Sequence, residues 1–332
     1  MLRIGIVGAG LRGRLFADAL ADRPGVEVVG FAEPSTRVAE DAATTGLPVV
    51  PTHVDLLSDL APDAVIVATP DFAHREVAVD VAKHGLHLLI EKPLATTLDD
   101  ANAIAAAVAS GGGQCLVGFE NRWNPHVLKA YESIQAGELG VPITSNATLS
   151  NSYFVPTQML SWAAQSSPAW FLMPHTIDML TWLTGRTPTR VSAVGSRGIL
   201  EQRGVDTWDV IRALLTFDDG TTASLSSAWV LPDAGEGIVD FRFGVIGTEG
   251  SLSADLSHQG LTTVTDRQRS LWPLSGRIGR SAVGPAVWMV QDFAAALIDG
   301  TDLGPGIDQG LLVTRTICAI EDSLRTSAPI SL

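Results

Sequence analysis

Three glycines near the start of the chain have the spacing of a phosphate-binding turn. Gly8, Gly10 and Gly13 form a G-x-G-x-x-G pattern between the apolar run Leu2–Val7 and the helix-like run Leu11–Ala21. The first glycine permits a tight turn, the second lets a pyrophosphate approach the backbone, and the third lets the helix pack close to the strand. The first N–H groups of the helix then face the phosphates. In this context the pattern predicts a dinucleotide site.

An acidic residue follows the glycine turn at the distance typical of ribose recognition. Glu33 lies 20 residues after Gly13, at the end of the apolar run Val26–Ala32. Its carboxylate can accept hydrogen bonds from both adenosine ribose hydroxyls and would repel a 2′-phosphate, which favours NAD over NADP. The tripeptide Ser35–Arg37 can instead hold a phosphate, so NADP stays open.

The first part of the chain alternates strand-like and helix-like segments that would position these residues. Apolar runs without alternation predict strands buried on both faces, at Leu2–Val7, Val26–Ala32, Ala64–Ala68, Leu86–Ile90 and Gln114–Phe119. Helix-length segments separate them, at Leu11–Ala21, Ser35–Thr44, Ala73–His84 and Leu98–Ala109. Repeated β-α units predict a parallel α/β sheet, and we assign residues 1–122 to this first domain.

After residue 122 the pattern changes to long alternating segments. These predict strands with unlike faces, at Ile143–Phe154, Val191–Gly198, Trp208–Phe217, Thr221–Leu231 and Val239–Ile246. Helices are expected at Ala169–Leu183, Pro285–Ile298 and Asp308–Ser327. Residues 123–332 are therefore expected to form an α+β domain with a large, mostly antiparallel sheet. One face of that sheet would be open to solvent or to a partner subunit; Trp208 and Trp229 fit either such an interface or the core.

Composition excludes several classes of protein. The 22 basic and 36 acidic residues give a net charge of −14, which argues against a nucleic-acid binder and against docking on an anionic membrane. The two cysteines, Cys115 and Cys318, make neither a disulfide framework nor a zinc motif, and we predict no metal site. The chain shows no signal-peptide pattern and no membrane-span run, so we expect a cytoplasmic protein.

Further motifs resemble one family when taken in order. They are Asp63–Pro70 followed by His74, Gly85–Pro93 with its Glu-Lys-Pro ending, Gly118–Pro125, His175-x-x-Asp178 and Gly247–Gly250. This combination resembles the Gfo/Idh/MocA oxidoreductases over nearly the whole chain. The resemblance implies an NAD(P)-binding Rossmann domain followed by a substrate-binding domain with a large open sheet. It also implies hydride transfer between nicotinamide and a secondary alcohol or ketone of a sugar, inositol or related polyol, in homodimers or homotetramers formed through that sheet.

The resemblance assigns roles to individual residues. Lys92, at the carboxyl edge of the sheet, would orient the hydroxyl and stabilise alkoxide, and His175 would be the base, with Asp178 on the same helix face. The predicted cofactor-binding residues are Gly8, Gly10, Leu11, Arg12, Gly13, Glu33, Thr69, Pro70, His74, Glu91 and Lys92. Arg12 would contact a phosphate or point into solvent, and His74 would reach the nicotinamide or simply begin a helix.

One position departs from the family. Many members carry an aspartate four residues before the histidine, and here that residue is Phe171. A phenyl ring accepts no proton, so the pocket should be flatter and more apolar, with rings that stack on sugar C–H faces. The predicted substrate-binding residues are Arg122, Trp123, Tyr153, Trp162, Trp170, Phe171 and Asp178. The alternative for each aromatic residue is ordinary core packing.

Three functions remain open on these grounds. The first is a dehydrogenase or reductase that uses Lys92 and His175 without the aspartate. The second is a redox-neutral enzyme of the glycosidase type that keeps its NAD bound. The third is a nucleotide-binding sensor without catalysis. The intact lysine and histidine favour the first two.

Overall fold

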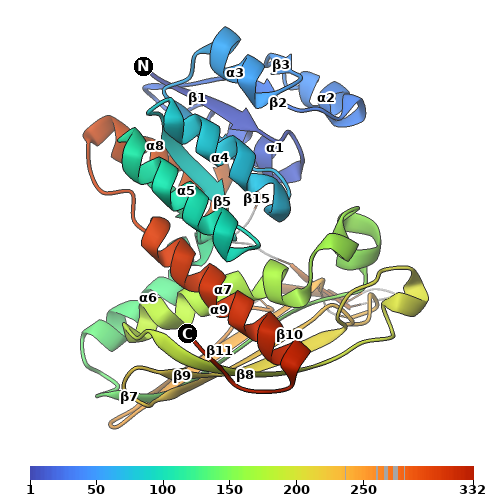
Figure 1. The fold of residues 1–332 in the computed structure, drawn as a ribbon, viewed down its shortest axis with the longest axis vertical. Coiled ribbons are helices and arrows are strands. Elements are labelled where there is room, and N and C mark those ends of the chain that lie inside the picture. Colours follow the sequence, from blue (N-terminus) through green and yellow to red (C-terminus); the bar gives the residue numbers. More distant parts are fainter. Residues whose placement is uncertain (236, 259–260, 265–267, 272–275, 280) are drawn as a thin grey trace. The chain divides into compact units, whose positions relative to one another are not determined.

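The computed structural model describes residues 1–332 except 236, 259–260, 265–267, 272–275 and 280. The chain divides into two compact units (Figure 1). The first consists of Met1–Trp123 and Ser275–Thr314, and the second of Asn124–Leu274 and Arg315–Leu332. Each unit is built around its own sheet.

The sheet of the first unit has six parallel strands in the order β3-β2-β1-β4-β5-β6. The strands are β1 Leu2–Val7, β2 Val26–Ala32, β3 Val49–Val50, β4 Ala64–Val67, β5 His87–Glu91 and β6 Cys115–Gly118. The predicted parallel sheet is confirmed, because continuous Val, Ile and Leu runs mark strands covered on both faces.

Helices cover both faces of this sheet (Figure 1). They are α1 Leu11–Leu20, α2 Thr36–Ala43, α3 His53–Leu60, α4 His74–Lys83, α5 Leu98–Gly111 and α8 Pro285–Asp299, with short 3₁₀ turns η1 Asp71–Ala73 and η2 Glu120–Trp123. Helix α3 was not predicted. It begins with a capping box in which the Thr52 side chain accepts the Asp55 N–H and the Asp55 carboxylate accepts the Thr52 N–H.

Helix α8 belongs to the first unit although it follows most strands of the second unit's sheet in sequence. Its residues Val290 and Phe293 share one buried apolar cluster with Phe16 and Leu20 of α1 and with Ile4 of β1. The sequence predicts residues 275–314 in the second domain, because nothing local marks a segment that returns to an earlier sheet. The assignment of cofactor and substrate roles to the two parts stays a prediction.

The sheet of the second unit has seven strands in the order β12-β11-β7-β10-β9-β8-β17. The strands are β7 Pro142–Asn151, β8 Pro188–Ser196, β9 Val210–Phe217, β10 Thr222–Ala228, β11 Val239–Gly247, β12 Ser251–Asp255 and β17 Ile330–Ser331. The predicted, mostly antiparallel sheet is confirmed, but β7 and β10 pair in parallel, which alternation alone does not reveal. The turn at Asp219 and Gly220 joins the antiparallel pair β9 and β10, and Gly220 has φ +82°.

One face of this sheet is covered by helices (Figure 1). The second unit contains α6 Pro125–Gln135, α7 Pro168–Thr184 and the end of α9 Ile307–Thr326. Helix α7 begins at a Ser167 cap and ends at Gly185, and it packs on β7 and β10. The remaining short elements are η3 Val155–Met159, η4 Ala163–Gln165, η5 Glu201–Arg203, β13 Leu261–Val264, β14 Gln268–Leu271, β15 Gly276–Ile278 and β16 Ser281–Val283.

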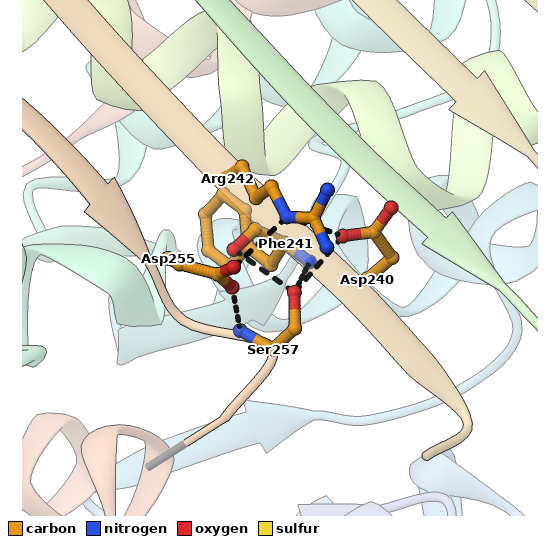
Figure 2. Close-up of polar contacts among 5 residues, drawn as sticks. All are labelled: Asp240, Phe241, Arg242, Asp255 and Ser257. Atoms are coloured by element: carbon orange, nitrogen blue, oxygen red, sulfur yellow. Dashed lines mark hydrogen bonds and ion pairs between the residues drawn. The ribbon is translucent and has the colours of Figure 1, made fainter. Parts of the chain in front are cut away.

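Edge strand β12 is tied to β11 by polar side chains (Figure 2). Arg242 Nε lies 3.0 Å from Asp255 Oδ2 and 3.2 Å from Asp240 Oδ1. Ser257 Oγ donates to Asp240 Oδ1 at 2.9 Å and accepts the Phe241 N–H at 2.9 Å. Burial opposes ionisation of Asp255, but hydrogen bonds from Ser257 and the charge of Arg242 outweigh it and lower its pKa. The cluster fixes the edge of the sheet.

None of the helices in the described parts of the chain is long and apolar enough to span a membrane.

Candidate active site

The three glycines of the first turn serve different purposes. Gly8 has φ +95°, and a Cβ there would lie 2.6 Å from the Ala68 carbonyl oxygen. A Cβ at Gly13 would lie 1.9 Å from the Gly8 carbonyl oxygen. A Cβ at Gly10 would meet no other part of the described chain within 4 Å. The chain itself therefore requires glycine at two positions, while the open space at Gly10 fits the approach of a ligand.

The N-terminus of α1 adds hydrogen-bond donors at the same place. Gly10 is its N-cap and supplies no side-chain cap, and the first turn carries no acidic residue. The exposed Leu11 side chain leaves the helix end open. Free N–H groups at a helix N-terminus fit a phosphate, so the turn and helix fit a dinucleotide.

Glu33 connects the end of β2 to the glycine turn. Its Oε2 accepts the Ala9 N–H at 3.0 Å, and its Oε1 accepts the Ser35 N–H at 2.9 Å. The carboxylate is thereby held beside the predicted phosphate turn, where a ribose would follow. Ser35, Thr36 and Arg37 follow it and are exposed.

Thr69 and Pro70 follow β4 at the same edge of the sheet. Thr69 Oγ1 is buried and has no hydrogen-bond partner among the described residues. A buried hydroxyl without a partner is costly, so this atom also fits contact with a ligand.

His74 joins two strand-end turns. Its Nδ1 lies 2.8 Å from the Pro93 carbonyl oxygen, its Nε2 lies 3.2 Å from the Thr69 carbonyl oxygen, and its side chain is 1% exposed. Burial lowers the pKa of His74, although Asp71 and the two carbonyls oppose this. The ring therefore acts as a clamp between the turn after β4 and the turn after β5.

Replacing His74 with alanine is expected to lower the free energy of unfolding by about 2–3 kcal/mol, because a buried carbonyl loses its partner and a cavity opens. Denaturant unfolding measures this. His84→Ala is the matched control, since His84 is exposed at the end of the same helix and its ring lies 2.7 Å from the Asp80 carbonyl oxygen of its own turn. Equal stability of the His74 variant and the control variant would contradict the clamp.

Lys92 lies in a buried cluster of charges after β5. Lys92 is 8% exposed and Glu91 is 7% exposed, and the Lys92–Pro93 bond is cis. Burial is the largest influence on the pKa of Lys92 and lowers it. Arg12 lowers this pKa further, whereas Glu91, Glu120 and Asp71 act in the opposite direction. Arg12 pairs with Glu91 and Glu120, and this pairing was neither of the two placements expected from sequence.

The first unit therefore brings most of the predicted cofactor residues together at the carboxyl ends of its parallel strands. Gly8 follows β1, Glu33 follows β2, Thr69 follows β4 and Lys92 follows β5. Ligands of open α/β sheets bind at this edge. Glu120 follows β6 in the same way, and this position was the signal that could have identified it from sequence.

The predicted substrate residues of the second unit form a smaller group. The centroid of the Phe171 ring lies 6.0 Å from the ring centroid of Trp162 and 5.7 Å from that of Trp229. Trp229 is fully buried, which places it in the core of this unit. His175 lies one turn after Phe171 on α7, half-buried, and Asp178 is fully buried one turn further.

The remaining predicted substrate residues lie outside this aromatic group. Tyr153 stacks under Arg203, whose Cζ is 3.8 Å from the ring centroid. Trp170 lies in the first turn of α7, where its backbone N–H donates to Ser167 Oγ. Trp123 belongs to the first unit and donates from Nε1 to Asp292 Oδ2 at 3.1 Å. Arg122 lies in η2 of the first unit, half-buried.

Trp229 was missed as a neighbour of Phe171. Leu225, Ser227 and Trp229 alternate along and just after β10 and are all buried, so the same face continues beyond the strand. This alternation was the available signal, but the sequence could not show that α7 covers that face.

Comparison with known proteins supports both units. Residues 2–119 match the model of an oxidoreductase family with an NAD-binding Rossmann fold, and residues 127–253 match the GFO/IDH/MocA C-terminal domain. The chain is 30% identical over 281 residues to scyllo-inositol 2-dehydrogenase (NAD(+)) of Bacillus subtilis strain 168, covering 81% of this chain and 78% of the relative.

Solved structures share the fold over the full length. Scyllo-inositol dehydrogenase from Lactobacillus casei, with bound NAD(H) and scyllo-inositol, aligns with a TM-score of 0.86 at 19% identity, covering 100% of this chain and 99% of that one. A levoglucosan dehydrogenase in complex with NADH and levoglucosan aligns at 0.84 with 26% identity, covering 99% of both chains. With its NAD-binding Rossmann domain and the matching C-terminal domain, the chain belongs to the Gfo/Idh/MocA family of oxidoreductases.

Proposed function

We propose that the protein transfers hydride between a nicotinamide cofactor and a secondary alcohol or ketone of a sugar, inositol or related polyol. The observation that carries this proposal is the placement of buried Lys92 at the sheet edge that also holds the glycine turn, Glu33 and Thr69. The relatives named above, a scyllo-inositol and a levoglucosan dehydrogenase, support the substrate class. NAD is the proposed cofactor because Glu33 would repel a 2′-phosphate.

Within this proposal Lys92 and His175 serve the reacting carbon. When bound, the nicotinamide accepts or returns the hydride. The Lys92 ammonium orients the substrate hydroxyl and stabilises negative charge on its oxygen. The His175 imidazole takes up or returns the hydroxyl proton, because histidine is the side chain that most often serves as a general acid or base.

The aromatic group around Phe171 supports a substrate with an apolar C–H face. Phe171, at the position where many family members carry an aspartate, is half-buried and packs beside the half-buried Trp162 and the fully buried Trp229. Aromatic rings stack on the C–H faces of sugars but offer no acceptor to hydroxyls. We therefore propose a polyol or sugar that is recognised partly by ring contact.

Cofactor titration followed by a substrate panel tests the proposal. NAD⁺ and NADP⁺ binding is measured by calorimetry, and scyllo-inositol, myo-inositol, levoglucosan and glucose are then followed through the absorbance of reduced nicotinamide. Turnover with added NAD⁺ supports the dehydrogenase. Cofactor binding without turnover in either direction, with NAD⁺ and a polyol or with NADH and the corresponding ketone, contradicts the proposal. That result favours the redox-neutral enzyme or the sensor.

We also propose that the protein forms a homodimer or homotetramer through the outer face of the second sheet, the face opposite α7. Exposed apolar side chains gather there, with Val194 70% exposed and Leu214 48% exposed. Both line a hollow of about 740 Å³ together with Asn146, Arg212 and other polar residues. Exposed apolar side chains beside a hollow on an open sheet fit a protein interface.

Leu214→Glu is therefore expected to reduce the molar mass measured by light scattering, because it places a charge in the contact. The matched control is Val54→Glu, which changes a valine that is 57% exposed on α3. An unchanged mass for Leu214→Glu, or a monomeric wild type, would contradict the proposed interface.

A further inference from the structure

The guanidinium of Arg12 is held between two carboxylates from distant parts of the chain. Its Nε lies 3.0 Å from Glu91 Oε1, and its Nη1 donates to Glu120 Oε2 at 2.8 Å. The guanidinium also lies over the Phe16 ring, with Cζ 5.7 Å from the ring centroid. Two of the three guanidinium nitrogens, Nε and Nη1, therefore lie against carboxylates of the first unit.

This arrangement does not suit a phosphate. The two carboxylates offset the charge of the guanidinium, so Arg12 offers a phosphate little attraction of its own. Burial works against the Arg12 charge, but Glu120 and Glu91 outweigh it and raise the pKa of Arg12. Arg12 therefore stays charged beside its two carboxylates.

The Glu91 carboxylate contacts both Arg12 and the backbone of Lys92. Its Oε1 faces Arg12, and its Oε2 accepts the Lys92 backbone N–H at 3.2 Å. On the neighbouring strand Gly118 pairs with Glu91, and a Cβ there would lie 3.4 Å from Glu91 Oε2. The carboxylate thus bridges the first helix and the backbone of the proposed catalytic lysine.

We propose that Arg12 is a positioning residue for Lys92: by holding the Glu91 and Glu120 carboxylates it fixes the backbone and the charge environment of the lysine, and it does not bind a cofactor phosphate. The mechanistic part of this inference rests on the proposed function of Lys92. The structural part concerns the first unit alone.

The charges around Lys92 give the proposal two effects of opposite sign. Burial lowers the pKa of Lys92; Glu91, Glu120 and Asp71 act against burial, and Arg12 acts with it. Removing Arg12 should therefore raise the pKa of Lys92, also because two carboxylates lose their partner. Removing the charge of Glu120 should lower it.

Direct titration of the lysine tests this without any turnover. The sequence contains three lysines, Lys83, Lys92 and Lys129, so ¹³Cε-lysine labelling gives three side-chain signals, and Lys92→Ala assigns one of them. We expect the Lys92 midpoint to move to higher pH in Arg12→Met and to lower pH in Glu120→Gln. In Arg12→Lys, which keeps the charge, the Lys92 midpoint should lie closer to the wild-type value than in Arg12→Met.

Cofactor binding and kinetics separate positioning from phosphate binding. In Arg12→Met the NAD⁺ dissociation constant is expected to stay within about threefold of wild type, whereas a lost arginine–phosphate contact would weaken binding about 10- to 100-fold. With a substrate from the panel, kcat should fall about tenfold with little change in the KM for NAD⁺. If the ammonium form of Lys92 is active, the alkaline limb of the kcat profile should move to higher pH.

Arg14→Met is the matched control on the same helix, because Arg14 faces Asp41 at 3.9 Å and not the lysine. It should leave the Lys92 midpoint unchanged.

Weaker NAD⁺ binding by Arg12→Met with an unmoved Lys92 midpoint would overturn the inference. If Arg12→Met fails to fold, Glu120→Gln decides it, and an unmoved midpoint there contradicts it. Absence of turnover in wild type would defeat the proposed function and leave the titration result standing.

Discussion

Lys92→Ala is expected to lower kcat by about a thousandfold while NAD⁺ still binds within about threefold of wild type. The lysine is 8% exposed and lies where β5 ends, beside the turn that His74 clamps. Its ammonium would act mainly when charge develops on the substrate oxygen, and the loss of such a contact reduces kcat more than it weakens binding.

Two further variants make this result interpretable. Lys92→Met keeps the buried alkyl volume and should lose the same activity, which separates loss of charge from the effect of a cavity. Lys83→Ala removes an exposed lysine that pairs with Asp80 at 3.7 Å, and it should retain full activity. Near wild-type kcat in both Lys92 variants would remove Lys92 from the mechanism.

The strands of the first unit could be predicted closely because their sequence signal is local. Strands β1 and β2 begin and end at the expected residues, since apolar runs and glycine turns mark their limits. Helix α8 has an equally clear apolar pattern, but the sheet on which it packs lies more than 100 residues earlier in sequence. A local pattern identifies an element without identifying its partner.

The same limit applies to the candidate site. The glycine turn and Glu33 were predictable, because one strand, one turn and one helix supply them in sequence. Arg12 was not predictable in its contacts, because Glu120 is 108 residues away and meets Arg12 only when β6 lies in register beside β5. His74 likewise contacts Pro93 only because β4 and β5 end at the same edge.

Glu33→Ala is expected to change the preference for NAD over NADP by about 100-fold. The loss of charge-assisted hydrogen bonds to the ribose would weaken NAD⁺ binding about 10- to 100-fold. NADP⁺ should bind more tightly at the same time, because the repulsion of a 2′-phosphate is gone and Arg37 is exposed nearby. Calorimetry with each cofactor measures both effects.

Glu33 also orders the glycine turn through the Ala9 and Ser35 N–H groups, so the two contributions must be separated. A disordered turn would weaken NAD⁺ and NADP⁺ equally, whereas ribose recognition changes them in opposite directions. Glu27→Ala is the control, because Glu27 lies on β2, the strand that Glu33 follows, and pairs with Arg3 at 2.9 Å on the surface. Equal weakening of both cofactors by Glu33→Ala would restrict Glu33 to a structural role, and the choice of cofactor would then depend on the residues that follow it.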